Sequence, residues 1–392
     1  MKSSAVVFIG QAFSTGIYRH LALLGVELYK ACPAEVKFHF ASIGREANPK
    51  AWSIVRSTLP EANIICEETF EDIARRCVEL ARSYDTVLIH TGGGWGQTKH
   101  FVQARKRMDK MLAARIVFIG TTHSYRNDSF LRVPMSAFQY LLYRLYYRMV
   151  VFQCRYAAER FFGGNHLIKI GRGVVIPLGC EPFEAPAKEP PCGLSEKKDL
   201  VNILQDDRLF KFVYLAGFRP GKMHVWLVRA LAPILRRHPD ARIFFCGKGA
   251  QTVIDATKAA IRDEHLEKQI ILPGQIARDE VPWLLLHCNC AVVPSRSETF
   301  GHNFLEPMFA GLPVIGTRVG IGCDIIKDGE TGYVFEFEHP TSVQVVVEKM
   351  LTDRSSANRM GQKARALVEK RFTHEAVAQQ LCGLYSRVLA GM

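Results

Sequence analysis

Short apolar runs alternate with helix-like segments along this chain of 392 residues. In the first half, segments with helical periodicity, such as Ile17–Lys30 and Glu68–Tyr84, separate runs with the length of buried strands. These runs are Ala5–Ile9, Val36–Ala41, Asn63–Cys66, Thr86–His90 and Ile116–Ile119. The alternation predicts an α/β domain with a doubly wound parallel sheet.

The same alternation begins again near Lys211 and predicts a second α/β domain. A helical pattern over Val225–His238 lies between two of its expected strands. Those strands are Phe212–Ala216, Arg242–Cys246, Ile270–Leu272 and Ala291–Val293. Residues 182–198 are rich in proline and mixed in charge, which is typical of a linker. We therefore expect domains over residues 1–181 and 199–372.

Charge is unevenly spread over the chain. The formal net charge is +13, and Lys99–Arg148 holds ten Lys and Arg against two Asp. A net charge of +8 in one stretch indicates an anionic partner, either a membrane surface or a nucleic acid, and the alternative is a solvated helix face. Within it, Phe130–Met149 has apolar residues at helical spacing beside Arg144 and Arg148. We expect a helix packed on the sheet, whose arginines and tyrosines could serve an interfacial surface.

Other features limit the class of protein. No window of 18 apolar residues predicts a membrane-spanning helix, and the apolar run at Ala5–Ile9 is too short for a signal-peptide core. The eleven cysteines are scattered without paired metal-ligand spacing. A reduced, cytoplasmic protein without a bound metal or other cofactor is expected.

The stretch Ser295–Gly316 carries two carboxylates, Glu298 and Glu306. It follows the expected strand Ala291–Val293, and its second part, Asn303–Ala310, has the pattern of a helix closed by Gly311. Ligands of open α/β sheets bind beyond the carboxyl ends of the strands, where Glu298 is expected. Carboxylates accept paired hydroxyl donors, so one glutamate could hold sugar hydroxyls and the other a ribose diol. The alternative is an exposed glutamate pair on an ordinary βα unit.

This stretch closely resembles the E-x7-E donor motif of the retaining glycosyltransferases of family 4. The matching residues are Glu298-Thr299-Phe300-Gly301 and Glu306-Pro307-Met308-Phe309-Ala310-Gly311, with Thr299 and Pro307 departing from the common pattern. The resemblance implies the GT-B fold, with two facing doubly wound Rossmann-like domains and an interdomain cleft. It also implies that a C-terminal helix, residues 373–392, packs back on the N-terminal domain.

The resemblance assigns roles to further residues. Gly217–Lys222 lacks the spacing of a P-loop, but Arg219 and Lys222 match an Arg and Lys that clamp the donor diphosphate. His123 matches a histidine near the reacting sugar. Donor contacts are implied for Glu298, Glu306, Phe300, Gly301, Gly247 and Gly16, and Trp95 is a candidate for stacking on an acceptor.

These features predict a retaining glycosyltransferase that moves a sugar from a nucleotide-sugar donor to a glycan or lipid-linked acceptor, in cell-envelope polysaccharide or glycolipid synthesis. His123, Arg219, Lys222 and Glu298 form the expected catalytic set. One rival is a GT-B nucleotide-sugar epimerase, which needs no acceptor. Another is a basic nucleic-acid-binding protein, which we do not expect because no RNA-binding signature appears. The resulting hypothesis places the enzyme in the cytoplasm, at the inner face of the cell membrane.

Overall fold

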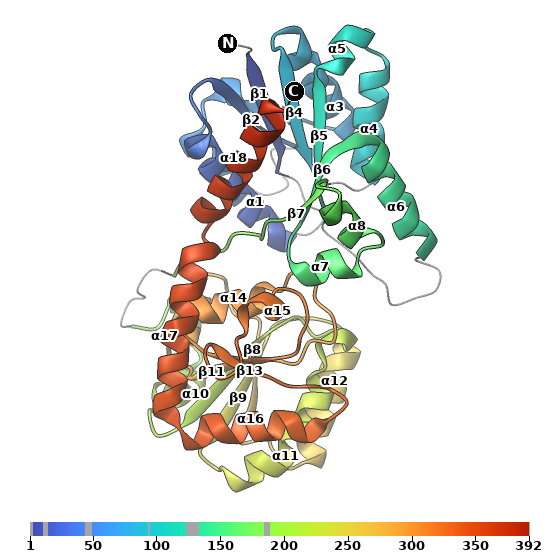
Figure 1. Ribbon diagram of the computed structural model, residues 1–392. Helices are drawn as coiled ribbons and strands as arrows, with labels where there is room; N and C mark the ends of the chain where they lie inside the picture. The colour runs from blue at the N-terminus through green and yellow to red at the C-terminus, as the bar shows by residue number, and fades with distance from the viewer. Residues whose placement is uncertain are drawn as a thin grey trace. The chain divides into compact units, whose positions relative to one another are not determined.

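The computed structural model describes residues 3–10, 15–43, 49–92, 95–122, 133–183 and 189–391. The chain forms two compact units, each built around one parallel sheet (Figure 1). The N-terminal unit extends to Glu181 and includes the chain from Phe372 onward, and the C-terminal unit comprises Pro182–Arg371.

The N-terminal sheet has seven parallel strands in the order β3-β2-β1-β4-β5-β6-β7. The strands are β1 Ser4–Ile9, β2 Val36–Ile43, β3 Ile64–Glu67, β4 Thr86–Thr91, β5 Ile116–Thr122, β6 Tyr147–Phe152 and β7 Gly173–Val175. The helices are α1 Thr15–Ala31, α2 Pro49–Thr58, α3 Phe70–Glu79, α4 Trp95–Lys106, α5 Lys110–Ala114, α6 Val133–Tyr146, α7 Arg155–Arg160, α8 Gly164–Lys169 and α18 His374–Ala390.

Successive residues of β1 point into two different cores. Val6 and Phe8 belong to a cluster that includes residues of α1, α2 and α18, whereas Ala5 and Val7 belong to a cluster that includes residues of α3 and α4. Both faces of the sheet are therefore covered, as a doubly wound fold requires. Helix α18 packs along α1, and in Figure 1 it lies beside the strands that open the chain.

The C-terminal sheet has six parallel strands in the order β10-β9-β8-β11-β12-β13. They are β8 Phe210–Leu215, β9 Ala241–Cys246, β10 Ile270–Gly274, β11 Cys290–Val293, β12 Val314–Gly316 and β13 Gly332–Val334. The helices are α9 Cys192–Ser195, α10 Lys198–Gln205, α11 His224–Arg237, α12 Gln251–Asp263, α13 Val281–Leu286, α14 His302–Phe309, α15 Gly322–Ile325, α16 Pro340–Thr352 and α17 Arg354–Arg371.

Two of the expected helices end earlier than predicted. The helix expected over Phe130–Met149 ends at Tyr146, and Met149 lies in β6, whose pairing with both β5 and β7 overrides the helical spacing. The helix expected over Glu68–Tyr84 begins at Phe70, because Thr69 caps it by accepting a hydrogen bond from the Asp72 N–H. It gives way to a 3₁₀ turn at Leu80–Arg82.

The proline-rich segment 182–198 contains helix α9 and the first residue of α10, and it belongs to the C-terminal unit. Residues 184–188 lie outside the described part of the chain. Among the helices that the structure describes, none is both long and apolar enough to cross a membrane.

Candidate active site

The candidate site lies where the strand order of the C-terminal sheet reverses. Strand β8 stands between β9 and β11, so the loops that leave β8 and β11 begin side by side at the carboxyl edge of the sheet. The crevice at such a switch point is where open α/β sheets bind ligands. The first loop carries Arg219 and Lys222, and the second carries Glu298.

The loop after β8 is fixed by backbone contact with the loop after β9. The Phe218 N–H donates to the Lys248 carbonyl at 3.0 Å, and the Ala250 N–H donates to the Phe218 carbonyl at 2.9 Å. A Cβ atom on Gly247 would lie 2.1 Å from the Ala216 carbonyl oxygen. Gly247, predicted as a donor contact, is therefore needed for the close packing of these loops.

A short 3₁₀ turn, Pro220–Lys222, presents Lys222 at the start of α11. The next residue, Met223, has a left-handed backbone with φ of 58°. Glycine adopts this conformation without the steric cost that methionine carries. Met223 therefore holds a turn conformation that is strained for its residue type.

Lys222 and Glu298 form an ion pair across the two loops. Both side chains are largely buried, with exposed fractions of 19% and 11%. The same carboxylate oxygen of Glu298 accepts from Ser295 Oγ at 2.8 Å and from Asn303 Nδ2 at 3.1 Å. Three donors converge on one oxygen, so the carboxylate is held in one orientation.

A buried layer supports this pair. The Tyr214 hydroxyl lies 3.1 Å from Ser295 Oγ and donates to the Lys222 carbonyl at 3.0 Å. Thr317 Oγ1 donates to the Ser295 carbonyl at 2.6 Å. Burial raises the pKa of Tyr214, so the phenol stays protonated and remains a donor.

The rest of the Glu298 loop is shaped by glycine. Gly301 caps α14 with φ of 98°, and a Cβ on Gly320 would lie 2.8 Å from Glu298 Cβ. Phe300 is buried, so its side chain anchors the loop. Glu306 lies on α14 and is half-buried.

Arg219 is among the described residues that line a groove beside α11, whereas Lys222 and Glu298 are not. Other residues lining this groove include Met223, Trp226, Arg229, Val253, Ala256 and Gln344. Buried His224 also lines it, with its ring stacked on Phe218 at 4.2 Å. Burial, and then the charge of Lys222, lower the pKa of His224 to about 4, so its imidazole is neutral near pH 7.

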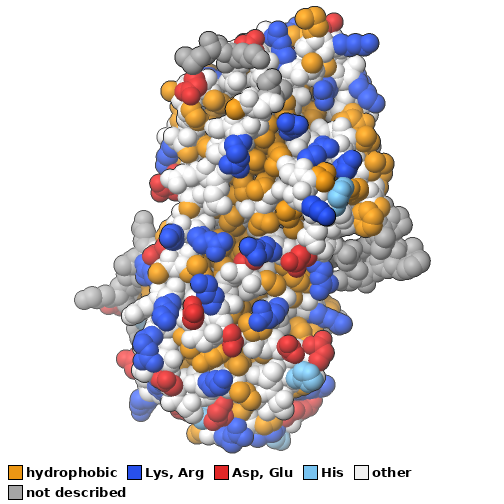
Figure 2. Space-filling view, viewed as in Figure 1, with side chains coloured by type: hydrophobic (Ala, Val, Ile, Leu, Met, Phe, Trp, Pro, Cys, Tyr) orange, Lys and Arg blue, Asp and Glu red, His pale blue; other side chains and the backbone are white. Residues whose placement is uncertain are grey.

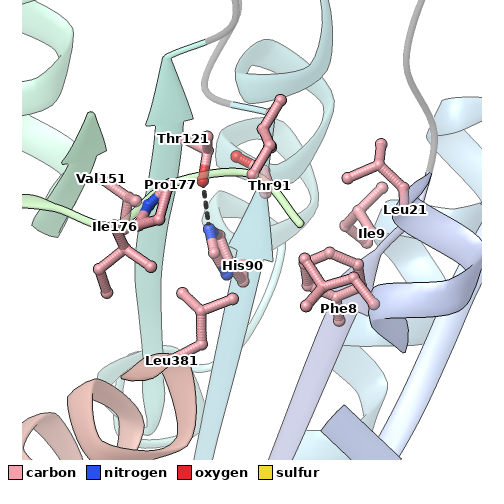
Figure 3. A pocket seen from close by; sticks show the side chains of 13 residues that line it. Phe8, Ile9, Leu21, His90, Thr91, Thr121, Val151, Ile176, Pro177 and Leu381 are labelled. Carbon is pink, nitrogen blue, oxygen red and sulfur yellow. Dashed lines mark hydrogen bonds between the residues drawn. The ribbon is translucent and has the colours of Figure 1, made fainter. Parts of the chain in front are cut away.

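A second pocket lies at the carboxyl ends of β1, β4 and β5 in the N-terminal unit (Figure 3). Its polar centre is His90, whose ring nitrogens lie 2.6 Å from Thr121 Oγ1 and 2.6 Å from the Tyr385 hydroxyl. Phe8 and Ile9 line one side, and Leu381 of α18 closes another.

For three predicted residues of the N-terminal unit, the structure describes the backbone alone or nothing. Gly16 lies in the first turn of α1, and Trp95 is the first residue of α4, where the backbone alone is described. His123 lies outside the described residues. Their predicted roles therefore stay predictions.

Sequence reasoning missed the residues that orient Glu298. Ser295 and Asn303 stand three residues before and five residues after it, so their spacing could have drawn attention to them. Tyr214 and Thr317 come from β8 and the end of β12, and only the strand order brings them to the site.

Comparison with known proteins supports this description. The family model of glycosyl transferases group 1 matches residues 196–367. The N-acetyl-alpha-D-glucosaminyl L-malate synthase of Bacillus anthracis is 31% identical over 198 residues, which are 50% of this chain and 50% of that protein. The matched region thus spans about half of that relative's length.

The similarity of this chain to solved structures covers both of its units. Anabaena HepE in complex with UDP and glucose has a TM-score of 0.69 at 16% identity and covers 98% of this chain and 100% of its own. Sucrose-phosphate synthase from Thermosynechococcus elongatus has a TM-score of 0.69 at 18% identity, with 99% of this chain and 100% of its own covered. At these identities the structures bear on the fold alone. Residues 196–367 thus match the model of the glycosyl transferases group 1, and the chain has the GT-B fold.

Proposed function

We propose that the protein is a retaining glycosyltransferase that uses a nucleotide-sugar donor and a glycan or lipid-linked acceptor. The observation that carries the proposal is the Lys222–Glu298 pair at the switch point, inside the region that matches the group 1 family. A cation for the diphosphate and an oriented carboxylate for the sugar stand on adjacent loops. The likeness to HepE, which binds UDP and UDP-glucose, is consistent with such a donor.

The proposed chemistry requires orientation and charge stabilisation. When the sugar leaves, negative charge grows on the nucleoside diphosphate, and the fixed ammonium of Lys222 stabilises it. Arg219 would have to turn from its groove to provide a second cation. Glu298, held by three donors, would accept hydrogen bonds from sugar hydroxyls and hold the donor in one position.

Retention follows from a front-face substitution in this proposal. The acceptor oxygen attacks on the side of the leaving phosphate, and a phosphate oxygen takes the acceptor proton. No enzyme nucleophile is then required. We also propose that no metal is needed, because Lys222 and Arg219 supply the positive charge that a metal would otherwise bring to the diphosphate.

We place the acceptor on the N-terminal unit, which carries Trp95, the candidate for stacking on an acceptor. A role in cell-envelope polysaccharide or glycolipid synthesis would bring the enzyme to a membrane face. The basic stretch Lys99–Arg148 favours such an anionic surface as a partner.

The test is incubation with a panel of nucleotide sugars, with mass spectrometry of the released diphosphate and of the product. We expect one donor class to give diphosphate and an acceptor-linked sugar with retained anomeric configuration. Conversion of the sugar nucleotide without any acceptor would favour the epimerase instead. Inverted product would overturn the retaining mechanism.

A further inference from the structure

The outer face of α6 carries large apolar side chains in solvent. Phe138, Leu141 and Leu145 are 45%, 51% and 64% exposed and follow one another at helical spacing. The opposite face of the helix is already buried, through Leu142 and Tyr143. A helix that packs only on its own sheet would put polar residues on the outer face. This second apolar stripe therefore indicates an interaction surface.

Two exposed arginines accompany the stripe. Arg144 precedes Leu145 on α6, Arg148 lies at the start of β6, and the sequence from 129 to 158 contains no Asp or Glu. Burial, and then the nearby charges of Arg144 and Arg148, lower the pKa of Arg172, so these cations lie close together. Figure 2 shows the hydrophobic and basic side chains side by side over α6. We call Phe138, Leu141, Arg144 and Leu145 of α6, together with Arg148 of β6, the α6 surface.

A hollow includes the last residue of α6, Tyr146. Its other lining residues come mostly from α4 and α5, including Val102, Ala113, Lys106 and Lys110. Among the described residues that line it, none is Asp or Glu.

Two other cations of the predicted basic stretch make contacts within the N-terminal unit. Arg105 Nε donates to the Ala113 carbonyl at 2.9 Å, and its guanidinium lies over the Phe118 ring. Arg107 lies 3.4 Å from Glu71 and forms an ion pair with it. Arg105 therefore contributes less to an exposed basic surface than Arg144 on α6.

We propose that the α6 surface docks on an anionic lipid bilayer. Leucine and phenylalanine side chains gain by entering the acyl boundary, while arginine keeps its charge at the phosphates and lays its apolar stem along the surface. A nucleic acid would pair with the arginines but would leave Leu141 and Leu145 in water. This proposal rests on the proposed function in one respect, that the acceptor is bound to a membrane. Docking on the bilayer does not itself require enzyme turnover.

The test is flotation of the full chain with vesicles of phosphatidylglycerol and phosphatidylcholine, against vesicles of phosphatidylcholine alone. We expect binding to the anionic vesicles at low salt, which weakens as salt screens the exposed charges. Arg144→Ser with Arg148→Ser should weaken binding by about five-fold for each arginine. Leu141→Ser with Leu145→Ser should weaken it by at least about ten-fold.

Matched controls lie on the C-terminal unit. Leu286→Ser with Val345→Ser removes two exposed apolar residues, and Lys258→Ser with Arg262→Ser removes two exposed cations. Both controls should bind vesicles as the wild type does. Hydrogen exchange on the wild type provides a second readout that needs no variant, since anionic vesicles should protect residues 137–148 and leave α16 unchanged.

Three results would overturn the proposal. If the wild type does not bind anionic vesicles at low salt, the protein does not dock on such a bilayer. If the control variants lose as much vesicle binding as the α6 variants, the α6 surface is not the docking site. Self-association without vesicles that disappears in the leucine variant would assign the surface to a second copy of the chain. Release of nucleoside diphosphate from the donor in the presence of a soluble acceptor, measured without vesicles, reports separately on the proposed function.

Discussion

At the scale of single residues, the candidate site depends on how firmly one carboxylate is held. Glu298 receives hydrogen bonds from Ser295 and Asn303 and pairs with Lys222. Such preorganised groups stabilise charge in a transition state without reorganising during the reaction. Removing the cation and removing the carboxylate should therefore have different kinetic consequences.

Lys222→Ala should lower kcat/KM by an amount equivalent to about 2–4 kcal/mol, the cost of losing one preorganised electrostatic group. The physical reason is uncompensated charge on the departing diphosphate. Steady-state kinetics with the preferred donor measures it, and Lys258→Ala on the exposed face of α12 is the matched control. If the kcat/KM of Lys222→Ala is close to that of the control, Lys222 does not stabilise the charge on the diphosphate.

The two glutamates should separate binding from turnover. Glu306→Ala should weaken binding of the free nucleoside diphosphate, because its carboxylate is assigned to the ribose diol. Glu298→Ala should leave that affinity nearly intact and depress kcat, because its assigned partner is the sugar. Calorimetry with the diphosphate alone decides between them, and the reverse pattern would exchange the two assignments.

Two buried histidines make stability depend on pH. Burial is the main cause that lowers the pKa of His39 and of His224 to about 4, with smaller contributions from Lys37 and Lys222. An unfolded histidine titrates near 6.5, so the unfolded chain takes up protons first as the pH falls. Each histidine should thus cost about 2 kcal/mol of stability between pH 7 and pH 5.

His39→Leu tests this linkage in the N-terminal unit. Both ring nitrogens of His39 are buried and find no hydrogen-bond partner among the described residues, so the substitution removes a group that favours unfolding in acid. Hydrogen exchange of β1 and β2 peptides should show a smaller loss of protection between pH 7 and pH 5 than in wild type. His265→Asn, at an exposed position, should keep the wild-type loss. An unchanged pH dependence in His39→Leu would show that His39 does not titrate below its normal range.

At the scale of elements, the sequence predicted the strands better than the helix ends. Apolar runs such as Ala5–Ile9 and Ala291–Val293 are strands because both faces of each sheet are covered. Strand β6 was missed, since the residues around Tyr147 and Met149 also fit helical spacing and only pairing with β5 and β7 decides. The motif residues Lys222 and Glu298 were found in sequence, whereas Tyr214 joins them only through the order of the strands.

Helix α18 is part of the core of the N-terminal unit. Leu384 and Val377 are buried in the cluster that contains Phe8 and Leu21. Leu384→Ala should therefore destabilise this unit by about 2–5 kcal/mol, through lost burial and the cavity left behind. Hydrogen exchange should show the loss in β1 and β2.

Gln379→Ala is the matched control, since it lies on the exposed side of the same helix. Protection of β8 and β9 should stay unchanged in both variants, because these strands belong to the other unit. Equal loss of protection in both units would show that they unfold together.

At the scale of the whole molecule, each unit has its own sheet and its own covering helices, and the two carry different parts of the proposed reaction. The C-terminal unit holds the proposed diphosphate site, and the N-terminal unit carries Trp95, the candidate for contact with the acceptor. Positive charge at the diphosphate is then supplied by side chains of a single unit. Nucleoside diphosphate should accordingly stabilise the C-terminal unit more than the N-terminal unit.

Activity should accordingly persist in excess EDTA. In the proposed reaction, Lys222 and Arg219 stabilise the charge on the diphosphate, so removing divalent ions should leave kcat/KM within about two-fold of its value, a change of about 0.4 kcal/mol. The measurement is product formation with and without EDTA, followed by addition of magnesium or manganese. Lys222→Ala is an informative partner, because a metal that bound the donor diphosphate could replace part of the missing charge and raise its activity. Complete loss of wild-type activity in EDTA, restored by either ion, would show that the side-chain cations are insufficient and that the donor is bound as a metal complex.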